Sequence, residues 1–265
     1  MICNEKIHTC QVYGQSILFT LLLSGPACTA HTDSWNEDFD GFITSTGATI
    51  VQHPLVEFSK GFGVSGSNAI KVVYEGYERG SKRVVKNLPL NEVAMAYELS
   101  FSVRFCDGFD FAMGGKLHGI GPRKPVTGGK PMTPEGWSAR LMFRQGGGLK
   151  TYVYHQNKSG KYGDSVSAKN FRFRSGQYYK IDMRVWLNEP ASAANGQISV
   201  SVDGKELIKH KGLQFRANEG RDGMIQTLLF STFHGGSLPE YAPRTADGEY
   251  KVDCAYFDDW TVYPL

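Results

Sequence analysis

The sequence lacks the motifs by which most metal-binding proteins are recognised. Its five cysteines and seven histidines include no Cys-x-x-Cys and no His-x-x-x-His pair, and no loop carries a cluster of carboxylates. Zinc and calcium sites are usually built on such spacings. We therefore expect no metal site and no cofactor.

Runs of basic residues, long helical periods, internal repeats and Pro- or Ser-rich linkers are missing as well. The formal charge is only +3, which argues against a nucleic-acid partner and leaves a polyanion of another kind open. The 265 residues include 31 glycines and 12% aromatics, a composition that favours an all-β protein.

An apolar segment near the start of the chain is typical of a secretory leader. Residues 16–30, "SILFTLLLSGPACTA", have a short apolar centre, end in small residues and are too short to span a bilayer. We expect residues 1–30 to be a signal peptide and residues 31–265 to be one secreted, extracellular domain. A lipoprotein anchored at Cys28 is the alternative, although Gly25 and Pro26 fit it poorly.

Removal of such a leader would leave two cysteines. Cys3, Cys10 and Cys28 would be lost with it, and Cys106 and Cys254 lie at the ends of expected strands. Two cysteines of an exported protein can pair. We predict a disulfide between them, with two unpaired buried thiols as the alternative.

Alternating apolar and polar residues recur along the rest of the chain, which is typical of strands. A two-residue turn signal, Asp203-Gly204, indicates a hairpin. We expect strands over residues 69–74, 96–105, 109–116, 137–144, 150–156, 178–187, 197–202, 226–233 and 255–263. They predict two stacked antiparallel sheets of the jelly-roll kind.

The same alternation places polar side chains together on one face of several strands. In strand 137–144 the core face carries Trp137, Ala139, Leu141 and Phe143, and the opposite face carries Ser138, Arg140, Met142 and Arg144. In strand 150–156 one face carries Lys150, Tyr152, Tyr154 and Gln156. In strand 109–116, the small residues Ala112 and Gly114 leave space in front of Lys116.

Lysine, arginine, serine and two tyrosines suit β-elimination from a polymer of uronic acids. The C5 proton of a uronate is weakly acidic, so the carboxylate must be neutralised, the proton removed and the leaving oxygen protonated. Lys and Arg can hold the carboxylate, and a Tyr whose pKa is lowered by cations can act as acid or base. Hydrolysis usually needs two carboxylic acids, and no Glu-x-Asp-x-x-Glu is present.

Four motifs in one order, GGKLHGI, WSARLMFR, YVYH and STFHGGS, resemble polysaccharide lyase family 14, the alginate and glucuronan lyases. The resemblance covers residues 36–265 and implies a concanavalin-like β-jelly roll that cuts acidic polysaccharide by metal-independent β-elimination. It places the catalytic lysine at Lys116, the substrate-holding pair at Ser138 and Arg140, and the paired tyrosines at Tyr152 and Tyr154. We expect Tyr152 to be the acid/base, with Lys116 holding the carboxylate or sharing the base role.

Four further residues are candidates around the same groove. Arg144 and Lys150 share the predicted polar faces and could bind neighbouring sugars. His234 shares a face with Thr232 and is a candidate groove residue, and His118 is expected to add a titratable group beside the groove.

The leading hypothesis is a secreted, monomeric lyase whose partner is alginate, with mannuronate-rich regions preferred. A glucuronan lyase of the same family is one alternative. A non-catalytic, lectin-like module that binds acidic glycans is the other, although a binder has no need of two phenols beside a lysine.

Overall fold

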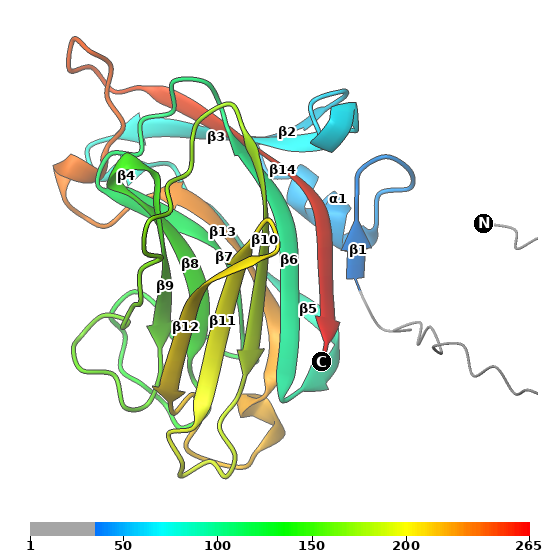
Figure 1. The fold of residues 1–265 in the computed structure, drawn as a ribbon, viewed down its shortest axis with the longest axis vertical. Helices are drawn as coiled ribbons and strands as arrows, with labels where there is room; N and C mark the ends of the chain where they lie inside the picture. Colours follow the sequence, from blue (N-terminus) through cyan, green and yellow to red (C-terminus); the bar gives the residue numbers. More distant parts are fainter. Residues whose placement is uncertain (1–34) are drawn as a thin grey trace, which may run out of the picture. The chain divides into compact units, whose positions relative to one another are not determined.

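The computed structural model describes residues 35–265, so the predicted leader lies outside the described residues (Figure 1). Strands dominate this part of the chain. They are β1 (Trp35–Glu37), β2 (Val56–Ser59), β3 (Ala69–Tyr77), β4 (Gly80–Ser81), β5 (Val84–Ala94), β6 (Ala96–Phe105), β7 (Gly114–Gly121), β8 (Ser138–Arg144), β9 (Gly148–Tyr154), β10 (Tyr178–Trp186), β11 (Gly196–Val202), β12 (Lys205–Leu213), β13 (Ile225–His234) and β14 (Val252–Pro264). One α-helix, α1 (Ser45–Val51), and the short 3-10 turns η1 (Val64–Gly66), η2 (Gln145–Gly147), η3 (Arg221–Gly223) and η4 (Pro239–Tyr241) complete the elements.

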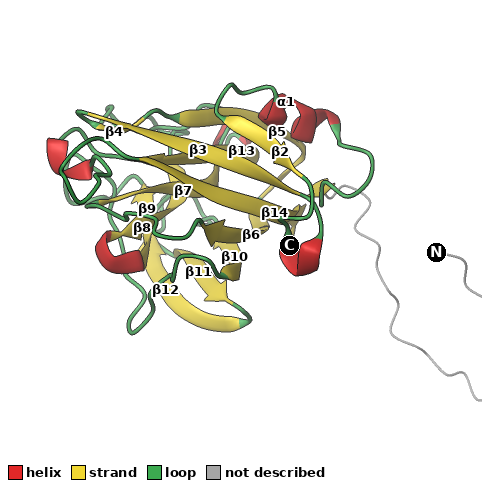
Figure 2. Ribbon diagram, turned by 90° about the horizontal axis from the view of Figure 1, so that it is seen from above, coloured by secondary structure: helices red, strands yellow, loops and turns green. Residues whose placement is uncertain are grey.

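The strands form two stacked antiparallel sheets (Figure 2). One has the order β12-β11-β10-β6-β14-β3-β2, with β1 paired to β14 and β4 paired to β3. The other has the order β5-β13-β7-β8-β9. This arrangement confirms the predicted all-β jelly roll.

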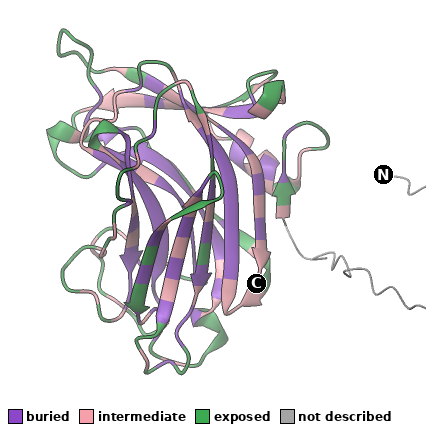
Figure 3. Cartoon of the chain, viewed as in Figure 1, coloured by how far each residue is buried: buried purple, intermediate pink, exposed green. Residues whose placement is uncertain are grey.

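The hydrophobic core lies between the sheets, where each sheet presents one face of alternating residues (Figure 3). Trp137, Ala139, Leu141 and Phe143 are all fully buried in it. The predicted core face of β8 is therefore confirmed. The opposite face of β8, and with it the polar side chains, is turned away from the core.

Strand β6 begins and ends at the predicted residues, and the turn between β11 and β12 has the expected form. Asp203 and Gly204 have φ values of 49° and 76°, as a two-residue hairpin turn of this type requires. Strand β5 was not predicted. It contains Pro89, which breaks the strand pattern and is tolerated because β5 is an edge strand.

The predicted strand 109–116 is wrong in its first half. Residues 106–113 turn instead, and β7 begins only at Gly114. The Asp110 carboxylate accepts hydrogen bonds from the backbone N–H groups of Ala112 and Arg244, both at 2.9 Å, and Ala112 has a φ of 43°. Asp110 thus stabilises a turn, and the pair Ala112 and Gly114 does not form the open floor that alternation suggested.

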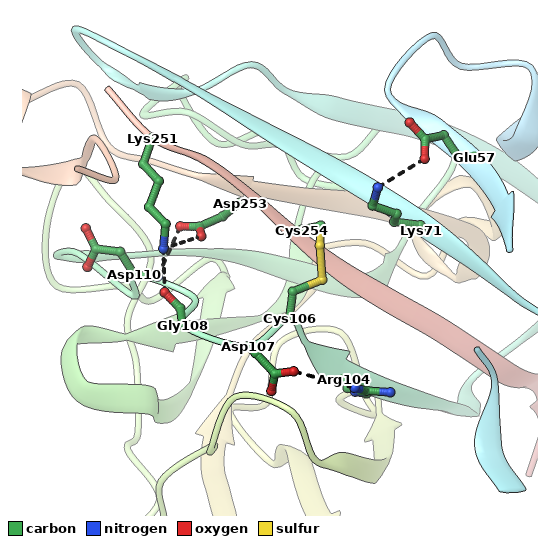
Figure 4. Close-up of a disulfide and its surroundings, with 10 residues drawn as sticks. All are labelled: Glu57, Lys71, Arg104, Cys106, Asp107, Gly108, Asp110, Lys251, Asp253 and Cys254. Atoms are coloured by element: carbon green, nitrogen blue, oxygen red, sulfur yellow. Dashed lines mark hydrogen bonds and ion pairs between the residues drawn. A yellow bond between two sulfur atoms is a disulfide. The ribbon is translucent and has the colours of Figure 1, made fainter. Parts of the chain in front are cut away.

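The predicted disulfide is present and fastens this turn to the larger sheet (Figure 4). Cys106 directly follows β6 and Cys254 lies in β14, with their Cα atoms 5.4 Å apart. Next to it, the Asp110 N–H donates to Asp253 at 3.0 Å, and Asp253 pairs with Lys251 at 2.7 Å. The segment that leads into β7 is therefore held at both ends.

Candidate active site

The outer face of the β7-β8-β9 part of the smaller sheet brings the predicted residues together. In the register, Lys116 lies opposite Met142, and Met142 lies opposite Lys150. The neighbouring row places Arg140 opposite Tyr152. The side chains of these two rows share one face and define what we call the cationic groove.

Two glycines of β7 make room for the arginines of β8. Gly119 pairs with Arg140 and Gly114 pairs with Arg144. A Cβ atom on Gly119 would lie 2.7 Å from Arg140 Cγ, and one on Gly114 would lie 3.3 Å from Arg144 Cδ. Each Cβ atom would also collide with the backbone of β8, at the Ala139 carbonyl oxygen for Gly119 and at the Phe143 carbonyl oxygen for Gly114, so side chains here would force the two strands apart. The sequence showed the glycines, but only the register shows which arginine each one accommodates.

Lys116 lies at the centre of the groove. Its Nζ atom is 4.1 Å from the centroid of the Tyr152 ring and 3.2 Å from the Met142 sulfur. Burial lowers the pKa of Lys116 well below its usual value, and the charges of four neighbours lower it further, in the order Arg140, Lys150, Arg144 and Arg83. Both causes favour the neutral amine, which is the form that can accept a proton.

Arg140 is a buried cation without an anion. Its side chain is only 7% exposed, and its Nε atom has no hydrogen-bond partner. Among the ion pairs formed within residues 35–265, none involves Arg140, Lys116 or Lys150. A guanidinium does not lose its proton in proteins, so a carboxylate from a ligand would supply the missing partner.

The half-buried Tyr152 has a raised pKa, contrary to the expectation that neighbouring cations would lower it. Burial is the largest cause, followed by the hydrogen bond with Tyr154, whose oxygen is 3.3 Å away. The charge of Arg140 acts in the opposite direction but is outweighed. Tyr152 is therefore a phenol that keeps its proton, which suits a general acid better than a base.

Two loops orient the tyrosine pair from outside the sheet. The Gly129 N–H donates to the Tyr154 oxygen at 2.8 Å, and the Gly163 N–H donates to Tyr152. Tyr154 is fully buried, so the structure places it beneath the groove surface, in contact with Tyr152. Neither glycine could be recognised as a site residue from the sequence.

Ser138 lies on the predicted face, opposite Tyr154 in the register. Its side chain is fully buried, and its hydroxyl donates to the Val126 carbonyl at 2.8 Å. Val126 belongs to the Pro- and Gly-rich segment 121–136 that also carries Gly129. Ser138 thus fastens this loop to the sheet.

The two histidines expected at the groove lie in the core instead. Strand β7 has a bulge between Lys116 and Gly119, which shifts the alternation so that His118 points inward. It is fully buried against Phe101, and its Nδ1 atom accepts the Ser231 N–H at 3.2 Å. The expectation that His118 lies beside the groove is therefore wrong.

His234 is likewise fully buried. Its ring stacks on Phe109 at 4.9 Å, and its Nε2 atom is 2.7 Å from the Asp110 carbonyl oxygen. Phe233, the preceding residue of β13, occupies the groove face opposite Lys116. The expectation that His234 lies in the groove is thus wrong, because the neighbouring residue Phe233 is the one whose side chain lies on that face.

The remaining cations lie around Lys116. Lys150 is half-buried, with its Nζ atom 3.3 Å from the Ser165 hydroxyl, and burial followed by the charge of Arg144 lowers its pKa. Arg83 was missed by sequence reasoning because it lies just before the unpredicted strand β5. Its guanidinium carbon is 5.0 Å from the Phe233 ring centroid.

Within residues 35–265 no three His, Cys, Asp or Glu side chains are grouped closely enough to hold a metal ion. In the same residues no helix has the length and apolar character needed to cross a membrane.

The family model for polysaccharide lyase 14 matches residues 75–253. This span is more than half of the chain, so the chain belongs to the polysaccharide lyase 14 family and the protein is a polysaccharide lyase. The resemblance inferred from the four motifs is confirmed. A comparison with curated protein sequences gave no match.

Solved structures support the same fold. The alginate lyase Aly36B, in a double mutant bound to alginate tetrasaccharide, has a TM-score of 0.70 at 19% identity, covering 89% of this chain and 98% of its own. The alginate lyase of Aplysia kurodai has a TM-score of 0.64 at 22% identity, covering 87% and 98%. The endo-β-1,4-glucuronan lyase of Trichoderma reesei has a TM-score of 0.60 at 12% identity, covering 88% and 96%.

Proposed function

We propose that the protein cleaves alginate, with mannuronate-rich regions preferred, by β-elimination that needs no metal. The observation that carries this proposal is the contact of Lys116 with Tyr152 beside the anion-free guanidinium of Arg140. A basic amine, an acidic phenol and a carboxylate-binding group are the three parts that elimination from a uronate requires.

In this proposal each group has one role. Arg140 holds the uronate carboxylate and stabilises the negative charge that develops on it. The neutral Lys116 amine takes the C5 proton, and the electrons of the C5–H bond form the C4–C5 double bond as the bond from C4 to the glycosidic oxygen breaks. Tyr152 donates its proton to that oxygen. Tyr154 positions the Tyr152 phenol.

The pKa directions favour this assignment over the reverse one. The pKa of Lys116 is lowered and that of Tyr152 is raised, so the proton starts on the phenol. Using Tyr152 as the base would require it to lose its proton in a site where burial favours the neutral form. The sequence predicted that Tyr152 acts as acid, base or both. We now propose that it acts as the acid only.

The test is an ultraviolet assay, because elimination leaves a double bond conjugated with the carboxylate. Purified protein treated with a chelator is incubated with alginate, polymannuronate, polyguluronate and glucuronan. We expect absorbance to rise most steeply with polymannuronate. A steeper rise with glucuronan would favour the alternative substrate, and binding of all four polymers without any absorbance change would contradict lyase activity on polyuronates.

We further propose that the enzyme is secreted as a monomer after removal of residues 1–30. The apolar segment in the sequence and the Cys106–Cys254 disulfide support export, since disulfides persist mainly outside the reducing cytosol. Sequencing the amino terminus of the secreted protein would locate the cleavage site.

A further inference from the structure

A second cationic hollow lies where β8 turns into β9, beyond the catalytic residues. It has a volume of about 400 Å³ and is lined by Arg144, Lys169 and Arg172, together with the polar residues Gln145, Ser167 and Asn170. None of the three cations forms an ion pair with a carboxylate among residues 35–265. The hollow is large enough to take a small ligand.

The walls of this hollow are fixed by backbone hydrogen bonds on both sides. The Ala168 N–H donates to the Leu149 carbonyl at 2.9 Å, and the Phe173 N–H donates to the Gly147 carbonyl at 2.7 Å. The segment that carries Lys169 and Arg172 is therefore attached to the start of β9. The backbone of the site is therefore ordered before a ligand binds, and only the exposed side chains of Lys169 and Arg172 would lose conformational entropy on binding.

Glycine again makes room for arginine. A Cβ atom on Gly148 would lie 3.3 Å from Arg144 Cβ and 3.7 Å from Arg172 Nη1. Gly148 therefore lies close to the side chains of both arginines. Arg172 donates one hydrogen bond to its neighbouring carbonyl, from Phe171, at 2.8 Å, which leaves further N–H donors for an anion.

Arg144 connects the hollow with the catalytic groove. It lies on the same face of β8 as Arg140, four residues and about 13 Å along the strand, and its charge influences both Lys116 and Lys150. A chain bound at Arg140 could therefore extend past Met142, which Lys116 and Lys150 flank, to Arg144 and Arg172.

We propose that this hollow is a second carboxylate-binding subsite, in which Arg144, Arg172 and Lys169 hold a uronate that is not cleaved. The proposal rests on the proposed function because it assumes a polyuronate substrate. It adds that the enzyme uses charge outside the reacting sugar to bind longer chains more tightly than short ones.

The test compares two double variants that each remove two positive charges. One is Lys169→Gln with Arg172→Gln, and the control is Lys205→Gln with Lys211→Gln, on β12 of the other sheet. KM is measured at low salt for oligouronates of increasing length. For the wild type and the control, KM should fall with chain length. For the variant of the hollow, most of this fall should be lost, with KM for polymer raised roughly five- to tenfold.

Binding separates the failure of this subsite from the failure of the proposed activity. Saturated oligomannuronates are titrated by calorimetry at several salt concentrations. Weaker binding and a smaller salt dependence in the variant of the hollow support the subsite even if no polymer is cleaved. Cleavage with KM curves and isotherms that coincide with those of the control would overturn the subsite and leave the lyase activity standing.

Discussion

Both faces of the smaller sheet carry buried side chains whose nitrogen atoms can be protonated, but the surroundings of these side chains differ. On the inner face, burial lowers the pKa of His118 and His234, and both are surrounded by aromatic rings. On the outer face, burial lowers the pKa of Lys116 and Arg140 in the same direction. The inner face packs against the other sheet, however, whereas on the outer face Lys116, Arg140 and Lys150 form no ion pair with a carboxylate among residues 35–265.

The difference lies in what each group can do when it loses water. An imidazole becomes neutral and is then compatible with an apolar core. The guanidinium of Arg140 cannot do so, and after burial its charge is the next cause that lowers the pKa of Lys116. Burial therefore favours neutral imidazoles within the core on one face. On the other face it favours a neutral lysine beside a guanidinium that a carboxylate could pair with.

The largest expected effect comes from replacing the two outer-face residues that we propose transfer protons, Lys116 and Tyr152. Lys116→Gln and Tyr152→Phe should each lower kcat/KM for polyuronate by about a hundredfold to ten-thousandfold, because each removes one proton-transfer partner. Steady-state ultraviolet kinetics would measure this loss.

A tyrosine on the other sheet provides the matched control. Tyr178 also has a pKa raised by burial, and its hydroxyl donates to the Phe62 carbonyl at 2.6 Å. Tyr178→Phe should leave kcat/KM within about twofold of the wild type, since surface substitutions rarely matter elsewhere. Equal losses for Tyr152→Phe and Tyr178→Phe would contradict a special role for the groove tyrosine.

The buried histidines of the inner face should make the free energy of unfolding fall at acid pH. Burial lowers the pKa of His234 from 6.5 to about 4, so the unfolded chain binds a proton more readily than the folded one. Stability from this group is present above pH 6.5 and is lost as the pH falls toward 4. At pH 5 the loss for His234 is about 2 kcal/mol.

Urea unfolding of the wild type and His234→Gln at pH 7 and pH 5 would measure this contribution. The variant should lose about 2 kcal/mol less than the wild type between the two pH values. Equal losses in the two proteins would show that His234 is not held neutral by the core.

Sequence alternation was sufficient for β8, because four apolar residues in regular spacing left one choice of inner face. It failed at His118, where a bulge adds one residue to β7 and turns the His118 side chain to the opposite face of the sheet. No residue type in the sequence indicates this bulge. It also failed before Gly114, where Asp110 stabilises a turn. Bulges and turns of this kind depend on the partner strand, which a single sequence does not show.

The grouping of the predicted site residues could be expected from the sequence, but their electrostatics could not. Motifs located Lys116, Arg140 and Tyr152, and the register confirms that they share one face. The direction of the Tyr152 pKa could not be predicted, because it depends on whether burial or the charge of Arg140 prevails. The role of Gly129 and Gly163 was also hidden, since both come from loops.

The smallest expected effect is a shift in the pH dependence of kcat/KM. This shift would show whether neighbouring charges, and not burial alone, lower the pKa of Lys116. Removing a nearby cation should raise this pKa, so the rising limb of kcat/KM against pH should move to higher pH. From the order of the charge effects, the move should decrease from Lys150→Gln to Arg144→Gln to Arg83→Gln. Lys211→Gln, on the other sheet, should leave the limb in place. A limb that stays fixed in all four variants would mean that burial alone sets the proton affinity of Lys116, as it does for the histidines of the inner face.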